Sequence, residues 1–201
     1  PSGKKWILLV MSLIFMAAAG GYGTIVFWFI STAAGFAAAL LLANVADTKE
    51  KQKRIILLAA VAFQLGLLAY FKYANLPAYT KEAFYELAGR VYEFEEKERL
   101  ALAGISFYIL MIIGYDIDVY RGETLAVRSF PAFSLFTGYF GHFVQGPIDS
   151  WQEAGKSLGV PSPVSFTDFQ DGCLRILSGL FKKLVLSERL AIMVDTIYGD
   201  Y

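Results

Sequence analysis

Apolar residues gather into three early runs that approach or meet the length of a membrane-spanning helix. Residues 24–46 and 55–76 meet the roughly 20 apolar positions that a perpendicular span needs, and residues 6–19 approach it. The glycine-rich stretch at residues 20–23 joins the first two runs without a processing site, so it predicts a helical hairpin rather than a cleaved signal peptide. We therefore expect three spans before residue 77.

The polar segment at residues 77–99 interrupts the apolar pattern and carries six glutamates against four basic residues. Five apolar side chains within it recur at helical spacing: Phe84, Leu87, Ala88, Val91 and Tyr92. This spacing predicts either an amphipathic helix on the membrane surface or a solvated helix packed on the protein. A fourth span is expected at residues 100–120.

The apolar pattern becomes irregular after Arg128. Residues 130–148 are rich in aromatics and glycine and are broken at Gly146-Pro147, which favours a re-entrant or interfacial segment over a simple span. The fold class predicted from these runs is all-α, a polytopic transmembrane helical protein with short, broken and re-entrant or interfacial helices. We expect residues 1–201 to form a single transmembrane domain.

A last helical region follows a polar loop that ends near residue 165. Ser165 or Thr167 can cap this helix, with Asp168 in its first turn. The apolar run at residues 169–198 contains Lys182 and its neighbour Lys183 near its middle, and charge there disfavours one lipid-facing span. We expect two helical pieces with an interfacial joint, or a helix that faces a polar interior.

Composition and charge support a membrane protein and set its expected orientation. The 201 residues are 56% hydrophobic, whereas soluble domains contain about 45–50% apolar residues. Formal net charge is zero, so global electrostatics gives no support for a nucleic-acid partner. The segment at residues 47–54 carries four basic residues, which places it in the cytoplasm and, by parity, the Lys4/Lys5 end with it.

Charged residues at the end of the fourth predicted span are the first functional candidates. Asp116 and Asp118 lie two positions apart, so they point to different faces of a helix and do not form a paired-carboxylate site. Asp118 and Arg121 lie three apart and are expected to form an ion pair. Asp116 has no obvious local partner, which makes it a candidate for a functional role.

The chain's only histidine, His142, lies just before the Gly146-Pro147 break. Backbone groups freed by such a break must be satisfied by protein or by water in a cavity, so polar side chains there are candidates for a pocket or tunnel wall. These candidates are His142, Gln145, Gly146, Pro147 and Asp149. The structural alternative is a turn whose histidine only satisfies a neighbouring hydrogen-bonding group.

Motifs for nucleotide and metal chemistry are absent from the sequence. It contains no Walker A motif, no dinucleotide-binding glycine motif and no HExxH, so we predict neither a metal nor a bound cofactor. Cys173 is the only cysteine, which excludes an intramolecular disulfide and a multi-thiolate zinc site. A serine triad would have to recruit His142, and nothing resembling a nucleophile elbow accompanies it.

Several motifs together resemble one membrane enzyme family. Residues 104–108 (GISFY) running into residues 115–122 (YDIDVYRG) are the most specific, and residues 139–148 (YFGHFVQGPI) and 179–195 (beginning GLFKK) add to them. A weaker match joins KKWILL near the N-terminus to Phe71-Lys72-Tyr73. These segments resemble the bacterial alginate O-acetylase-like branch of the membrane-bound O-acyltransferase family.

The resemblance implies a multi-pass protein of the bacterial cytoplasmic (inner) membrane. Such a protein moves an acyl group, here expected to be acetyl, through a membrane-embedded funnel. The donor would be a cytoplasmic thioester of coenzyme A or of an acyl-carrier protein. The acceptor would be a hydroxyl of an extracytoplasmic polysaccharide or of a partner protein. His142 and Gln145 would then be polar contacts in the tunnel wall.

The resemblance covers about the N-terminal half of a typical family member. The histidine that the family uses in catalysis lies in a later tryptophan- and arginine-rich segment with no counterpart here, so the resemblance does not make His142 the general base. We expect the 201-residue chain to be inactive alone.

Two departures from the family pattern leave the acyl group open. Gly141 replaces the usual proline, and Asp149 follows Gly-Pro-Ile as in the D-alanyl-transfer proteins of teichoic acid modification. D-alanyl transfer is therefore an alternative to acetyl transfer. A transporter or channel subunit and a non-catalytic membrane scaffold are further alternatives, because broken helices and buried polar groups also serve transport.

Overall fold

The computed structural model describes residues 2–46, 48–72, 103–144, 146–158 and 165–198. Every regular element in these ranges is helical: α1 (Ser2–Asn44), α2 (Glu50–Lys72), α4 (Ile105–Arg121), α5 (Phe130–Gly138), η1 (Trp151–Gly155), α6 (Phe166–Phe181), η2 (Lys182–Ser187) and α7 (Glu188–Tyr198). The elements η1 and η2 are short π-helices. The chain divides into two compact units, residues 1–160 and 161–201. The prediction of an all-α membrane protein with broken helices is confirmed, and the predicted surface helix at residues 77–99 lies outside the described residues.

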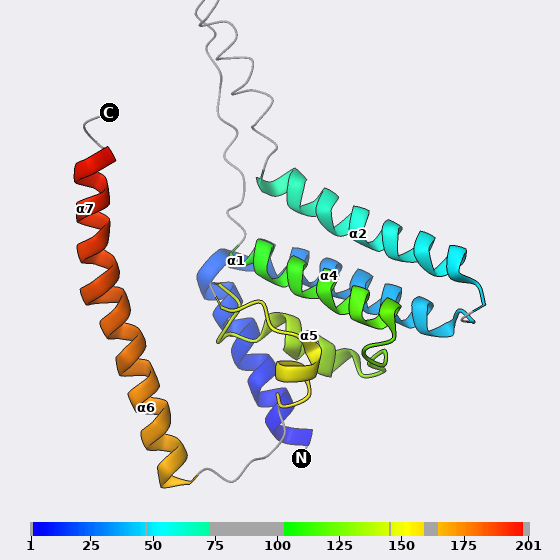
Figure 1. The fold of residues 1–201 in the computed structure, drawn as a ribbon. Helices are drawn as coiled ribbons and strands as arrows, with labels where there is room; N and C mark the ends of the chain where they lie inside the picture. The colour runs from blue at the N-terminus through cyan, green and yellow to red at the C-terminus, as the bar shows by residue number, and fades with distance from the viewer. Residues whose placement is uncertain (1, 47, 73–102, 145, 159–164, 199–201) are drawn as a thin grey trace, which may run out of the picture. The chain divides into compact units, whose positions relative to one another are not determined.

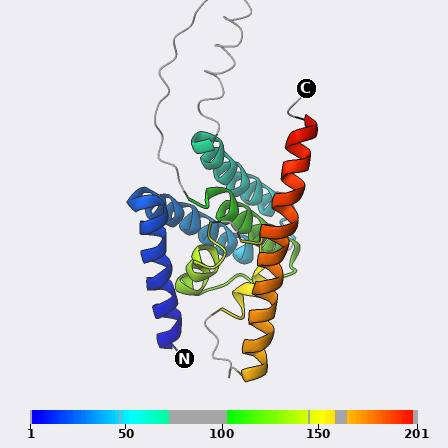
Figure 2. The ribbon, with the colours of Figure 1, turned by 90° about the vertical axis from the view of Figure 1, so that its left-hand side faces the viewer.

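Helix α1 is one long helix with a sharp bend at Gly21. Gly21 has φ 70° and ψ −178°, a left-handed φ that glycine adopts readily because it has no Cβ atom. Figures 1 and 2 show the two halves of α1 diverging at this point instead of running back side by side. The predicted hairpin is therefore wrong. Helical hairpins need a loop of about 2–5 residues, and here the helix resumes after one non-helical residue.

Helices α1 and α2 are long and apolar enough to cross a membrane. The sequence predicted three spans before residue 77, and the first two of them form the two halves of the single helix α1. The second half of α1, α2 and α4 lie side by side (Figure 1). Close approach of α1 to α4 depends on Gly35, because a Cβ atom there would collide with Ile112. Helix α4 begins at Ile105, inside the predicted fourth span, and ends at Arg121, followed by Gly122 with a left-handed φ of 75°.

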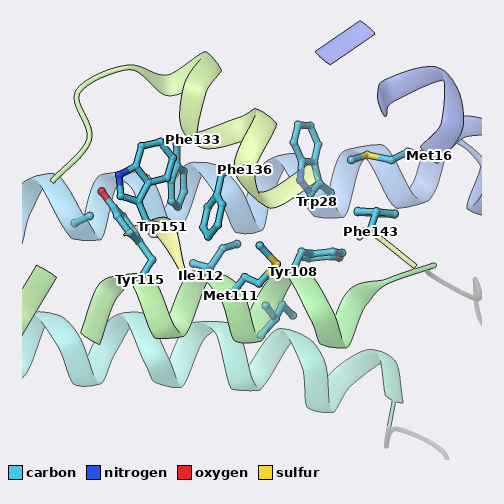
Figure 3. Close-up of a cluster of buried hydrophobic side chains, with 12 residues drawn as sticks. Met16, Trp28, Tyr108, Met111, Ile112, Tyr115, Phe133, Phe136, Phe143 and Trp151 are labelled. Carbon is cyan, nitrogen blue, oxygen red and sulfur yellow. The ribbon is translucent and has the colours of Figure 1, made fainter. Parts of the chain in front are cut away.

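The short helix α5 lies in the angle between the two halves of α1 (Figure 1). Its last six residues, from Phe133 to Gly138, are all buried. They pack into an aromatic-rich core with side chains from α1, α4 and η1 (Figure 3). Gly138 must lack a side chain, because a Cβ atom there would overlap Met16 and Trp28.

Buried hydrogen bonds between side chains join the helices of the first unit. The indole Nε1 of Trp28 donates to the hydroxyl of Thr137 at 3.1 Å, and the hydroxyls of Thr32 and Thr137 are 3.0 Å apart. Between α1 and α2, Ser31 Oγ donates to Gln64 Oε1 at 2.6 Å, while Gln64 Nε2 donates to the Ser31 carbonyl at 2.9 Å. Such bonds hold apolar helices together where lipid gives no hydrophobic driving force for association.

The described part of the second unit is a run of helix from α6 through η2 to α7, and none of the residues in these three elements is buried. Ser165 caps α6 as predicted: its hydroxyl accepts from the Asp168 backbone, and its own N–H and hydroxyl donate to the Asp168 carboxylate. These bonds lower the pKa of the Asp168 carboxyl from its usual value. The helix is continuous from α6 to α7, and the π-helix η2, which begins at Lys182, lies where the sequence predicted a joint between two pieces. Its place at a membrane interface stays a prediction.

Candidate functional site

The ring of His142 is held by two hydrogen bonds within its own part of the chain. His142 follows α5 in a turn and is 5% exposed. Its Nε2 lies 2.8 Å from the carbonyl oxygen of Phe136, and its Nδ1 lies 3.1 Å from Oδ2 of Asp149. The two partners fix the orientation of the imidazole ring and tie the end of α5 to the segment after the Gly-Pro break.

This geometry leaves no ring nitrogen free to take a proton from a substrate. A carbonyl oxygen only accepts hydrogen bonds, so Nε2 carries a proton and donates to Phe136. Nδ1 donates to an ionised Asp149 or accepts from a protonated one. Both nitrogens are engaged in either case, so His142 does not act as a general base in this conformation.

The Gly-Pro break lies inside the loop that His142 and Asp149 close. The N–H of Gly146 donates to the His142 carbonyl at 2.9 Å, and a Cβ atom on Gly146 would collide with His142. Pro147 is exposed and lacks an N–H, so it leaves no donor to satisfy there. The structure thus brings the candidates His142, Gly146 and Asp149 together, and Gln145 lies outside the described residues. Their place in a tunnel wall stays a prediction.

The acidic candidates on α4 behave differently from one another. Asp116 is 1% exposed, and within the described ranges neither of its carboxylate oxygens has a hydrogen-bond partner. A Cβ atom added to Gly35 of α1 would lie 3.7 Å from Asp116 Oδ2. Asp118 is only partly buried, which confirms that the two carboxylates face different ways.

The predicted ion pair between Asp118 and Arg121 is wrong. Arg121 instead lies 3.8 Å from the carboxylate of Glu123. The left-handed turn at Gly122 reverses the chain at the end of α4 and brings Glu123 back beside Arg121. Both side chains are more than half exposed, so this pair contributes little to stability.

A recess of about 760 Å³ that the sequence did not reveal lies where the end of α1 meets the segment after α4. Its polar lining residues are Asn44 and Arg128, and Phe36 and Leu40 supply part of its apolar wall. Asn44 and Arg128 are far apart in sequence, and no spacing signal connects them. Among the described residues, no group of three His, Cys, Asp or Glu side chains could hold a metal ion.

Comparison with known proteins identifies the family. The chain is 31% identical over 208 residues to the probable alginate O-acetylase AlgI of Pseudomonas putida, a match that covers 98% of this chain and 41% of that protein. This chain belongs to the alginate O-acetylase-like branch of the membrane-bound O-acyltransferase family. The AlgI proteins of Pseudomonas syringae and Azotobacter vinelandii are 31% and 33% identical, over 79% and 69% of this chain and 30% and 28% of their own lengths.

The chain spans about two fifths of the length of the Pseudomonas putida relative and less of the other two. No protein-family model matches the sequence. No solved structure matches it either.

Proposed function

We propose that the protein to which this chain contributes is a membrane O-acyltransferase. It transfers an acetyl group from a cytoplasmic thioester, of coenzyme A or of an acyl-carrier protein, to a hydroxyl of an extracytoplasmic polysaccharide. The observation that carries the proposal is the match of 98% of the chain to a protein named as a probable alginate O-acetylase. An acyl-accepting partner protein is the alternative acceptor.

In this proposal the described segment shapes the membrane-embedded wall and does not supply the general base. A general base must come within hydrogen-bond reach of the hydroxyl whose proton it removes, and it needs a free lone pair. Both nitrogens of His142 are already engaged by Phe136 and Asp149. The base therefore belongs to another segment of the enzyme, as the family resemblance implies.

The bond between His142 and Asp149 favours acetyl over D-alanyl as the acyl group. The argument for D-alanyl transfer was the aspartate after Gly-Pro-Ile. Its carboxylate lies 3.1 Å from His142 Nδ1, so loop structure alone accounts for an acidic residue there. The names of the relatives describe O-acetylation, which supports acetyl as the proposed acyl group.

The test is transfer of radiolabelled acetyl groups by the full-length gene product in proteoliposomes. Acetyl-coenzyme A or acetyl-carrier protein is supplied on one side and an uronate polysaccharide such as alginate on the other. We expect label in the polysaccharide that hydroxylamine releases, because hydroxylamine cleaves esters. If the folded full-length protein forms no ester with either donor, the proposed acetyl transfer is wrong. If the 201-residue chain alone transfers as much acetyl, the claim that another segment supplies the general base is wrong.

A further inference from the structure

An apolar recess of about 450 Å³ lies in the angle of the bent helix α1. Residues from both halves of α1 and from the start of α5 line it. Figure 1 shows α5 in the angle between the two halves of α1. Among its lining side chains are Trp6, Leu13, Val26, Trp28 and Phe29. The bend at Gly21 creates the recess, because it opens an angle between the two halves of α1. Helix α5 fills that angle only in part.

The lining chemistry matches a hydrocarbon and not a polar ligand. Among the described residues that line the recess, Ser134 is the one with a hydroxyl, amide or charged side chain, and its hydroxyl is buried. A ligand rich in hydrogen-bonding groups would lose its bonds to water in this recess without replacement, which disfavours its binding. An extended peptide would bring its backbone N–H and C=O groups to an apolar wall in the same way.

The volume of the recess is small compared with a helix and suits a hydrocarbon chain. One turn of α-helix, about 10 Å across and 5.4 Å long, already fills roughly 400 Å³. The recess thus encloses no more than a single turn of a helix. A flexible hydrocarbon chain adapts to the same volume and leaves no backbone group unsatisfied.

The position of the recess and the two lysines that precede it in the sequence indicate which kind of molecule supplies the hydrocarbon chain. It lies along α1, which is long and apolar enough to cross a membrane. Lys5 and the exposed Lys4 directly precede Trp6, which lines the recess. We propose that the recess binds one acyl chain of an anionic phospholipid, whose phosphate lies against Lys4 and Lys5.

Tryptophan fluorescence tests whether lipid enters the recess. Trp28 and Trp151 are both almost buried, with 3% and 8% exposure, but only Trp28 lines the recess. The full-length protein and its Trp28→Phe and Trp151→Phe variants are placed in bilayers of phosphatidylglycerol brominated on the acyl chain. The difference between parent and variant isolates each tryptophan's emission. We expect severalfold stronger quenching of Trp28 than of Trp151, and equal quenching overturns the proposal.

Two substitutions on the same helix provide the matched control. Val26 lines the recess and Val10 does not, and their exposures are 53% and 51%. Val26→Phe narrows the recess, so it should reduce the phosphatidylglycerol that stays bound in native mass spectrometry. Val10→Phe should leave the amount of bound lipid unchanged. Equal retention by the two variants overturns the proposal.

The headgroup contact is tested by neutralising both lysines. A Lys4→Gln/Lys5→Gln variant should lose its preference for phosphatidylglycerol over phosphatidylcholine. Quenching of Trp28 by brominated phosphatidylcholine should persist, because the acyl chain still fits the apolar wall. An unchanged preference for the anionic lipid overturns the assignment of the phosphate to these lysines.

Discussion

At the scale of single residues, the contact between His142 and Asp149 closes a loop of seven positions around the Gly-Pro break. The side chains of His142 and Asp149, both candidates from the sequence, bind each other in this contact. The same ring also binds the Phe136 carbonyl, so the loop is anchored to the buried end of α5. This arrangement makes His142 a positioning residue for the break.

The first prediction concerns the partner of His142 Nδ1. Asp149→Leu leaves that nitrogen without a partner in a buried place, which should lower the free energy of unfolding by about 1–3 kcal/mol. In Asp149→Asn, the amide can still donate to Nδ1 while Nε2–H keeps its bond to Phe136, so stability should stay near that of the parent. Thermal unfolding in detergent micelles, followed by Trp151 fluorescence, measures the stability of the two variants. Equal stability of the two variants would show that the contact does not hold the loop.

The second prediction concerns Asp116. Asp116→Leu has nearly the same shape and removes two oxygens that have no partner among the residues the structure describes. Relief of that desolvation cost should raise the free energy of unfolding by about 1–3 kcal/mol. The same thermal measurement checks it, with Asp118→Asn as the control at a partly buried position. If the Asp116→Leu protein were less stable than the parent, the Asp116 carboxylate would have a partner after all. If it were more stable but did not transfer acetyl groups, Asp116 would have a functional role.

Sequence reasoning reached only part of these residue contacts. The proximity of His142, Gly146 and Asp149 was predictable because all three lie within eight positions around one break. The Phe136 carbonyl was not predictable, since every residue carries a carbonyl and spacing does not show which one a ring nitrogen meets. The prediction of an Asp118–Arg121 ion pair was wrong because helical spacing cannot show that the helix ends in a left-handed turn at the next residue, Gly122.

At the scale of elements, the bend in α1 is the main difference from the expected fold. Apolar patterning correctly predicted helix on both sides of residues 20–23, and it predicted the cap at Ser165. The pattern could not show how many of those glycines leave helical geometry. One non-helical residue makes a bend, whereas several would have made a hairpin.

The third prediction compares two glycines that both have open space around their Cα atoms. Gly21→Ala forces a left-handed φ of 70° on a residue with a Cβ atom, which should destabilise the protein by about 1–2 kcal/mol. Gly66→Ala lies within α2 and should stabilise it by about 0.5–1 kcal/mol, because alanine favours helix. Thermal unfolding of both variants checks the opposite signs. If Gly21→Ala were neutral, α1 would be able to bend through another residue.

At the scale of the whole molecule, the packing partners of the helices were beyond the reach of the sequence. Helix α1 is apolar nearly all round, so no polar stripe marks the face that meets α4 or α2. The contacts that select those faces are single small or polar residues, such as Gly35 against Ile112 and Ser31 with Gln64. They are recognisable only once the helices are placed together.

The last prediction concerns how α1 crosses the membrane. If both halves of the bent helix are spans, Gly3 and Lys51 lie on the same side, and the basic residues at 47–54 place that side in the cytoplasm. Gly3→Cys and Lys51→Cys, in a Cys173→Ser background, should therefore react with a membrane-impermeant maleimide only in inside-out vesicles. Tyr22→Cys, at the 84% exposed position beside the bend, should react only in right-side-out vesicles.

The three labelling sites separate the possible outcomes, because each reports one end of a helix half. Peptide mass spectrometry resolves them individually in the full-length protein. Labelling of Gly3→Cys and Lys51→Cys from opposite faces would mean that the first half of α1 does not cross the bilayer. Labelling of both from the outer face would reverse the orientation, and the thioester donor would then have to reach the enzyme from the side opposite to residues 47–54.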